Sequence, residues 1–207
     1  MTGTILVADD HPLFRQALVV AAERVAPGMA VIQAGTVQRA AEHAAGAPDL
    51  KLMLLDLKMP GADGFSGIAM LHAERPEVPI LVISSAEGLT VAREARRFGA
   101  IGFIGKDRDL AAIEAAIGDA LAGKVAEEAQ QDEVNPVAEK VASLTPMQLK
   151  VLLELLRGRL NKQIAYDLQL SEVTVKKHVT ALMRRLDVNN RTQAALAARA
   201  LGLNLNG

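Results

Sequence analysis

Polar residues of types that take part in phosphoryl chemistry follow several short apolar runs in the first half of the chain. Asp9 and Asp10 follow the first run, Asp56 follows the third, the fourth ends in Ser84, and Lys106 comes soon after the fifth. If the runs are parallel strands, these side chains meet at one edge of one sheet, where ligands bind in such folds. Crowded carboxylates repel one another unless a divalent cation lies among them, and oxygen ligands suit Mg²⁺. The set predicts a phosphoryl-transfer site in which one of the three carboxylates attacks, Mg²⁺ and Lys106 neutralise charge, and a Ser hydroxyl at the end of the fourth run donates a hydrogen bond.

The elements that must position these residues alternate along the first 120 residues. The apolar runs are short, rich in β-branched residues or Leu, and without strict polar alternation, which is typical of strands buried on both faces. We predict strands over Thr4–Ala8, Met29–Gln33, Leu52–Leu55, Ile80–Ile83 and Ile101–Ile104, and helices over Leu13–Val25, Val37–Ala45, Phe65–Glu74, Leu89–Phe98 and Leu110–Leu121. The alternation predicts an α/β, flavodoxin-like fold, in which a five-stranded parallel sheet has helices on both faces.

The rest of the chain has only helical periods. Periodicity weakens over residues 124–143, which we interpret as a linker between a domain at 1–123 and an all-α domain at 144–207. Helices of the second domain are predicted over Pro146–Arg157, Asn161–Leu168, Glu172–Leu186 and Arg191–Ala200. Asn161 and Ser171 are good N-cap residues, and only a short turn separates the helices that they begin. This arrangement is a helix-turn-helix, whose second helix enters the major groove of DNA.

The two domains carry opposite charge, which the net charge of −1 conceals. Residues 1–143 hold 13 Lys and Arg against 20 Asp and Glu, whereas residues 144–207 hold 10 against 4. The basic domain is therefore a candidate for binding phosphate backbones, and the acidic domain for binding cations or a basic partner.

Composition excludes several classes of function. The chain has no cysteine, and so no disulfide framework, thiolate zinc site or cysteine nucleophile. No stretch approaches the roughly 20 apolar residues that cross a bilayer, and no secretory leader is visible, so we expect a cytoplasmic protein without a membrane partner. The absence of Trp and the single Tyr argue against single-stranded nucleic acid and leave duplex DNA as one candidate, which composition alone does not distinguish from another anion.

The stretch Glu172–Leu186 combines one apolar stripe with cationic outer faces. The apolar residues recur at helical spacing, which predicts that they are buried: Val175, Val179, Leu182 and Leu186. Lys176, Lys177 and Thr180 are left on the outer faces. Positive side chains near the first turns of a helix are unfavourable because of the helix dipole. Binding of an external anion is a reasonable explanation for their presence there. The alternative is a solvated amphipathic helix in a bundle.

The polar residues at the strand ends resemble the receiver domain of two-component response regulators, over residues 4 to about 122. The motifs that carry the resemblance are Asp9-Asp10, the segment Asp56–Gly64, Ser84 and the segment Gly102–Asp107. The resemblance implies that Asp56 is the phosphoacceptor. It also implies a Mg²⁺ site formed by Asp9, Asp10, Asp56 and the backbone carbonyl of Lys58.

The same resemblance gives roles to three further residues. Lys106 pairs with the phosphoryl group, Ser84 is the switch hydroxyl, and Phe103 is the aromatic residue that swings inward when Ser84 moves. Asp107 stands where many receivers have Pro. The alternative reading of Phe103 is an ordinary core residue, and that of the aspartates is capping of loops and helices.

The second domain resembles the LuxR-type helix-turn-helix over Leu144–Leu203, through the segments Leu144–Leu152, Gly158–Ala165, Leu170–His178 and Leu186–Arg191. A receiver followed by this domain resembles a NarL/FixJ-type response regulator. The resemblance implies dimer packing through Arg191–Ala200. It implies phosphate contacts from Asn161, Lys162, Thr174 and Lys176, and base-edge or groove contacts from Lys177 and Thr180.

Three residues depart from the LuxR pattern. Gln148 and Gln163 stand where Glu is usual, which removes charges that would orient neighbouring Arg or Lys. Leu160 stands where Ser is usual, which removes a hydroxyl at a helix start and leaves Asn161 to cap the helix or to contact phosphate.

These features predict a transcriptional regulator rather than an enzyme, in which a sensor histidine kinase phosphorylates Asp56 and the altered receiver frees or dimerises the DNA-binding domain. The active form is expected to be a homodimer on double-stranded DNA. One alternative is a Mg²⁺-dependent phosphatase or phosphotransferase, although Lys58 stands where phosphatases of the dehalogenase type have a second Asp. The other alternative is a constitutive DNA-binding regulator whose receiver serves only for dimerisation.

Overall fold

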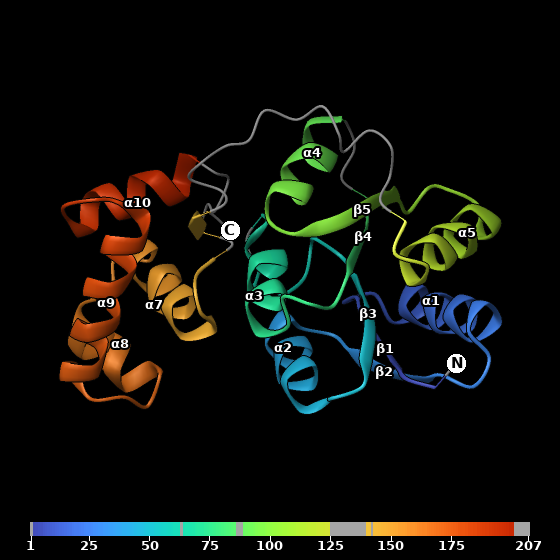
Figure 1. Ribbon diagram of the computed structural model, residues 1–207, viewed down its shortest axis with the longest axis horizontal. Helices are drawn as coiled ribbons and strands as arrows, with labels where there is room; N and C mark the ends of the chain where they lie inside the picture. Colours follow the sequence, from blue (N-terminus) through green and yellow to red (C-terminus); the bar gives the residue numbers. More distant parts are fainter. Residues whose placement is uncertain (1, 63, 86–88, 125–139, 142, 201–207) are drawn as a thin grey trace.

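The computed structural model describes residues 2–62, 64–85, 89–124, 140–141 and 143–200, although not the side chains of residues 89, 199 and 200. An α/β domain formed by the N-terminal part of the chain lies beside a helical domain formed by the C-terminal part (Figure 1). Most of the predicted linker, 124–143, lies outside the described residues, so the domain boundaries stay a prediction. No helix of the described part is both long and apolar enough to cross a membrane.

The α/β domain has the predicted parallel sheet, with strand order β2-β1-β3-β4-β5. Its strands are β1 (Thr4–Ala8), β2 (Ala30–Ala34), β3 (Leu50–Leu55), β4 (Ile80–Ser84) and β5 (Ala100–Gly105). Its helices are α1 (Pro12–Val25), α2 (Val37–Gly46), α3 (Ser66–Glu74), α4 (Leu89–Arg97) and α5 (Leu110–Leu121). The flavodoxin-like fold predicted from the sequence is confirmed.

The central strands have no polar face because each of their two faces borders a hydrophobic core. Along β1, Ile5 and Val7 face the core that α1 and α5 cover, whereas Leu6 and Ala8 face the core beneath α2, α3 and α4. Successive strand residues point to opposite faces. Figure 1 shows the two helical layers on either side of the sheet. Polar residues are thus displaced to the strand ends, where the candidate site lies.

The helical domain consists of α7 (Pro146–Leu156), α8 (Asn161–Asp167), α9 (Glu172–Leu186) and α10 (Arg191–Ala200). Ser171 caps α9 as predicted, since its hydroxyl accepts a hydrogen bond from the Thr174 N–H at 3.1 Å. The predicted cap at Asn161 is wrong. Leu160 occupies the N-cap position of α8, and Asn161 is the first residue within the helix.

The two glutamines that depart from the LuxR pattern satisfy main-chain donors at helix starts. The Gln163 Oε1 accepts a hydrogen bond from the Leu160 N–H at 2.8 Å, and the Gln148 Oε1 accepts one from the Thr145 N–H at 3.0 Å. In a capping box, the side chain of the third helical residue accepts a hydrogen bond from the N-cap N–H, and the amide oxygen of Gln can do this as the carboxylate of Glu does. The start of α8 is therefore stabilised without a hydroxyl at residue 160.

Candidate functional site

Asp9 and Asp56 lie at the carboxyl ends of adjacent strands, one residue beyond β1 and β3. The main chain fixes both positions, because the Asp9 N–H donates to the Ala34 carbonyl at 3.0 Å and the Asp56 N–H donates to the Ala8 carbonyl at 2.9 Å. Asp9 is fully buried, and Asp56 is 2% exposed. Two carboxylates buried side by side require compensating positive charge.

Lys106 supplies that charge from the loop after β5. Its Nζ lies 2.6 Å from the Asp9 Oδ2 and 2.7 Å from the Asp56 Oδ2, and the side chain is 13% exposed. Burial by itself lowers the pKa of Lys106, but the hydrogen bonds to Asp56 and Asp9 outweigh it and raise the pKa above its ordinary value. Lys106 is therefore an ammonium at neutral pH, held against both carboxylates.

The remaining carboxylate oxygens are held by main-chain donors. The Asp9 Oδ1 accepts from the His11 N–H at 2.8 Å, and the Asp56 Oδ1 accepts from the Lys58 N–H at 3.2 Å. Asp10, on the solvent side, pairs with the His11 Nδ1 at 2.7 Å. One potential ligand atom from each of Asp9, Asp10, His11 and Asp56 lies within 4.8 Å of the others. The carboxylate oxygens match the ligand preference of Mg²⁺, and three carboxylates around one ammonium leave surplus negative charge for a cation.

The two predicted switch residues lie on β4 and β5, next to this cluster. Ser84 is fully buried at the end of β4, and its carbonyl accepts the Lys106 N–H at 3.0 Å. Phe103 lies on β5 in register with Val82 and is half-buried against the core beneath α2, α3 and α4. Ser84 is thus tied through the main chain to the residue that pairs with Asp56.

Two residues that support the cluster were missed by the sequence analysis, Phe14 and Arg15. The Lys106 Nζ lies 4.7 Å from the centre of the Phe14 ring, a cation–π distance. The Arg15 Nη1 donates to the Asp9 carbonyl at 2.6 Å and its Nε to the Gln33 Oε1 at 3.3 Å. The available signal was their place in the first turns of a helix that follows the acidic pair, because helical side chains point back toward the N-terminus.

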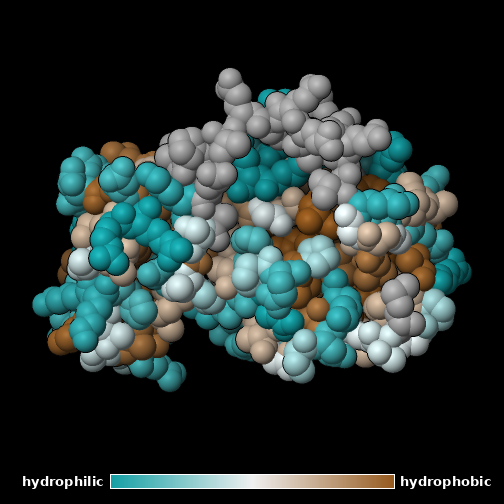
Figure 2. Space-filling model, in the orientation of Figure 1, coloured by the Kyte–Doolittle hydropathy of each residue, from teal (hydrophilic) through white to brown (hydrophobic). Residues whose placement is uncertain are grey.

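The predicted DNA-contacting residues lie on α8 and α9. Lys162, Lys176, Lys177 and Thr180 are exposed, whereas Asn161 and Thr174 are half-buried. The Thr174 hydroxyl lies 2.8 Å from the Ser171 hydroxyl, so it shares in the cap of α9. Hydrophilic residues cover much of the helical domain in the view of Figure 2. The buried stripe predicted for α9 is present, with Val175, Leu182 and Leu186 buried and Val179 half-buried.

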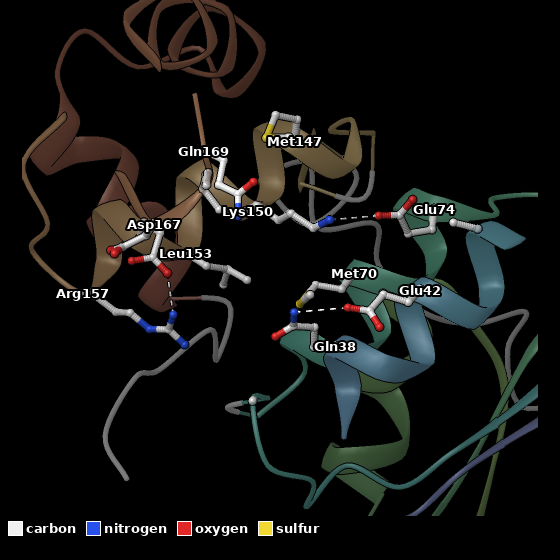
Figure 3. Close-up of a pocket in the computed structure, with 15 residues that line it drawn as sticks. Gln38, Glu42, Met70, Glu74, Met147, Lys150, Leu153, Arg157, Asp167 and Gln169 are labelled. Atoms are coloured by element: carbon white, nitrogen blue, oxygen red, sulfur yellow. Dashed lines mark hydrogen bonds and ion pairs between the residues drawn. The ribbon is translucent and has the colours of Figure 1, made fainter. Parts of the chain in front are cut away.

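The two domains meet through α3 and α7, and α7 lies between α9 and the α/β domain (Figure 1). The Lys150 Nζ on α7 lies 3.4 Å from the Glu74 Oε1 on α3. Figure 3 shows this ion pair at a cavity of about 610 Å³ between the domains, lined also by Met70 and Met147. Gly61, in the loop that follows Asp56, lines the same cavity. The cavity between the domains thus extends to the loop that follows Asp56.

Comparisons with known proteins agree with the structure of both domains. The model of the response regulator receiver domain family matches residues 5–118, and that of the bacterial regulatory proteins of the luxR family matches residues 142–198. The chain is 37% identical to the glycerol metabolism activator of Pseudomonas putida over 207 residues, with 94% of each chain covered. It is 30% identical to the nitrate/nitrite response regulator protein NarP of Escherichia coli, with 93% of this chain and 92% of NarP covered.

A solved structure shows the same fold. The crystal structure of a LuxR-family two-component response regulator from Aurantimonas has a TM-score of 0.56 and is 28% identical in sequence. The likeness covers 63% of this chain and 94% of that one.

Proposed function

The chain belongs to the two-component response regulators that join a receiver domain to a LuxR-type DNA-binding domain, and from this membership we propose that phosphorylation of Asp56 by a sensor histidine kinase controls its binding to duplex DNA. The family consists of transcriptional regulators and not of enzymes, which sets aside the phosphatase alternative. The observation that carries the proposal is the buried cluster in which one ammonium, that of Lys106, is shared by Asp9 and Asp56.

Each residue of the cluster has a task that its position supports. Asp56 presents a carboxylate oxygen as the nucleophile, and the ammonium of Lys106 is within reach of a phosphoryl oxygen added to that carboxylate. Asp9, Asp10, Asp56 and the Lys58 carbonyl would hold Mg²⁺, which shields the charge between the carboxylate and the incoming phosphoryl group. Ser84 and Phe103 are the proposed switch residues. The Lys106 N–H donates a hydrogen bond to the Ser84 carbonyl. A shift of Lys106 toward a phosphoryl group on Asp56 would therefore also displace the end of β4.

A hollow beside the cluster supports access by a protein phosphodonor. Its volume is about 460 Å³, and it is lined by His11, Leu13, Phe14, Ala17, Ser85 and Lys106. Leu13, at the start of α1, is 90% exposed. An exposed apolar side chain beside a charged site provides a contact for a partner's apolar surface while the phosphoryl group is transferred. We therefore propose that the kinase contacts this hollow when it delivers the phosphoryl group.

Control of DNA binding requires that phosphorylation favour one arrangement of the domains over another. In the present arrangement α7 packs on α3, and the outer face of α9 is exposed. The receiver therefore restrains the DNA-binding domain by fixing its position and not by covering α9. A dimer must place two α9 helices in successive major grooves. Release of α7 from α3 would allow that placement, and Leu196 on α10, which is 59% exposed, offers an apolar contact for the homodimer.

Loss of the ion pair between the domains should raise the DNA affinity of the unphosphorylated protein. Glu74 and Lys150 form a partly exposed pair, worth at most about 1 kcal/mol, so Glu74→Gln is expected to increase affinity by up to roughly fivefold. The measurement is a titration of duplex DNA with unphosphorylated protein at low salt. The charge exchange Glu74→Lys with Lys150→Glu should restore wild-type affinity, and Glu77→Gln, elsewhere on the receiver, is the matched control. Equal affinities for wild type and Glu74→Gln would rule out a restraining role for the pair.

The two adjacent cations of α9 are expected to affect DNA binding differently. Lys176 is placed to contact phosphate, so Lys176→Ala should weaken all duplexes about equally and reduce the salt dependence by roughly one counterion. Lys177 and Thr180 are placed to contact base edges, so Lys177→Ala or Thr180→Ala should cost about 1–3 kcal/mol on a preferred duplex and far less on a scrambled one. The measurement is a salt-resolved titration with both duplexes. A uniform loss for Lys177→Ala would assign it to phosphate contact.

Mapping of the bound DNA across the source genome tests the whole proposal. Wild type and Asp56→Asn are compared, each with and without a phosphodonor. Phosphorylation-dependent occupancy that requires Asp56 supports the proposal. Identical occupancy in all four samples would favour the constitutive alternative, in which the receiver serves only for dimerisation. The cytoplasmic location expected from the sequence stays a prediction.

A further inference from the structure

The outer face of α9 carries an apolar residue at the start of its row of polar residues. Val173, Lys177, Thr180 and Arg184 follow one another at i, i+4, i+7 and i+11 and form one stripe, on the side of the helix opposite the buried stripe. Val173 lies in the first turn of α9, and its residue surface is 63% exposed. The core therefore does not use this side chain.

The surface around Val173 is hollowed and has an apolar floor. The hollow has a volume of about 410 Å³ and is lined by Val173, Lys176, Lys177, Thr180, Ala181 and Arg184. The Thr180 hydroxyl donates to the Lys176 carbonyl at 3.0 Å, so its hydrogen is used within the helix. The methyl groups of Val173, Thr180 and Ala181 are then the uncharged part of a surface that three cations surround.

A single exposed apolar residue needs no special explanation in a soluble domain. Val173 differs from that general case because of where it lies. The first turns of a recognition helix contact base edges in the major groove. The cations beside Val173 complement the phosphates on either side of that groove. The occupant that fits both the charges and the apolar floor is therefore duplex DNA, with its major groove facing Val173.

We propose that Val173 determines sequence specificity by contacting the C5 methyl group of a thymine in the major groove. Thymine is the one base that presents a methyl group there, and apolar side chains recognise it by contact. Lys177 would read a neighbouring base pair through hydrogen bonds, so the two residues distinguish different positions of one half-site. This inference rests on the proposed binding of DNA through α9.

Deoxyuridine provides a direct test, because it differs from thymidine only by the methyl group. The full-length protein, phosphorylated with acetyl phosphate and Mg²⁺, is first used to select a preferred duplex from a randomised pool. Each thymine of that duplex is then replaced singly by uracil. Loss of a buried methyl group, about 0.8 kcal/mol, corresponds to a fourfold loss of affinity, and we expect it for wild type at one thymine in each half-site.

The same substitutions are then measured with Val173→Ala. We expect its affinity for the thymine duplex to fall about fourfold and the further effect of uracil at that position to disappear, since the contact is already lost. Val20→Ala, at a 37% exposed position on α1, is the matched control and should keep the full uracil effect. Thermal unfolding should be the same for both variants and wild type, because neither Val side chain is buried.

The outcomes separate this inference from the proposed function. If Val173→Ala selects the same sequence and keeps the same sensitivity to uracil, the role of Val173 is overturned while DNA binding stands. If wild type selects no sequence from the pool, sequence-specific binding through α9 fails, and the inference fails with it. A uniform loss of affinity on all duplexes would show a nonspecific contact and would also overturn the inference.

Discussion

Asp56→Asn is expected to abolish the incorporation of phosphate from acetyl phosphate in the presence of Mg²⁺. The amide that replaces the carboxylate has neither the nucleophilic oxygen nor the negative charge that the site requires. Asn has nearly the shape and volume of Asp and so fits the buried position of Asp56, which is 2% exposed, although its amide nitrogen cannot accept one of the two hydrogen bonds that Lys58 and Lys106 donate. The measurement is the intact mass of the protein after incubation with the donor, with one added phosphoryl group expected for wild type.

Asp119→Asn provides the matched control for this experiment. Asp119 lies on α5, is 56% exposed and pairs only on the surface with Lys124, at 3.0 Å. It should incorporate phosphate as wild type does. Labelling of Asp56→Asn at the wild-type level would mean that another residue accepts the group, and the assignment of Asp56 would be wrong.

The sequence was sufficient to predict the sheet and the place of the cluster. Strands buried on both faces read as continuous apolar runs, and in a parallel sheet every run ends at the same edge. Asp9 and Asp56 were therefore predicted to lie at one edge of the sheet once β1 and β3 were recognised as strands. The strand order, with β1 between β2 and β3, places these two residues on adjacent strands.

Contacts between distant side chains were beyond the same reasoning. Phe14 and Arg15 belong to a helix whose pattern predicts only an apolar and a polar face. Their place in its first turns puts them near the acidic pair, but it does not identify Arg15 as the donor to the Asp9 carbonyl. The ion pair of Glu74 with Lys150 joins two domains, and sequence patterns within each domain do not report how the domains meet. The exposure of Val173 follows from the sequence, because Val173 lies opposite the predicted buried stripe of α9, but the hollow around it becomes visible only in the structure.

Capping shows a different limit of sequence reasoning. Asn161 has a favourable side chain for an N-cap, yet the N-cap position belongs to Leu160, one residue earlier, where the Gln163 side chain satisfies the main-chain N–H. A residue type that favours a cap is thus overridden when a neighbouring side chain stabilises a cap one residue earlier. The departures at Gln148 and Gln163 were read as lost charges, whereas the structure shows that their amide oxygens perform the capping.

Lys106→Met is expected to destabilise the protein by about 3–5 kcal/mol in buffer without Mg²⁺. Removal of one partner from a buried ion pair leaves uncompensated charge, and here the carboxylates of both Asp9 and Asp56 lose their shared ammonium. The main-chain donors at His11 and Lys58 contribute hydrogen bonds but no full positive charge. The measurement is the free energy of unfolding from urea titrations. Lys124→Met, which removes a surface partner of Asp119, should change it by less than about 1 kcal/mol.

The pH dependence and a second variant test the cause of this loss. The folded protein raises the pKa of Lys106 above its ordinary value of about 10.5, so the stabilisation is fully present below that pH and is lost as pH rises through the folded value. The difference in stability between wild type and Lys106→Met should therefore persist from neutral pH into moderately alkaline solution and narrow in strongly alkaline solution. Adding Asp56→Asn to Lys106→Met, or adding Mg²⁺ to the single variant, should recover part of the lost stability, since each relieves repulsion between the buried carboxylates. If Lys106→Met loses the same stability whether or not Asp56→Asn or Mg²⁺ is added, Lys106 stabilises the domain through packing of its alkyl chain on Phe14 and not through its charge.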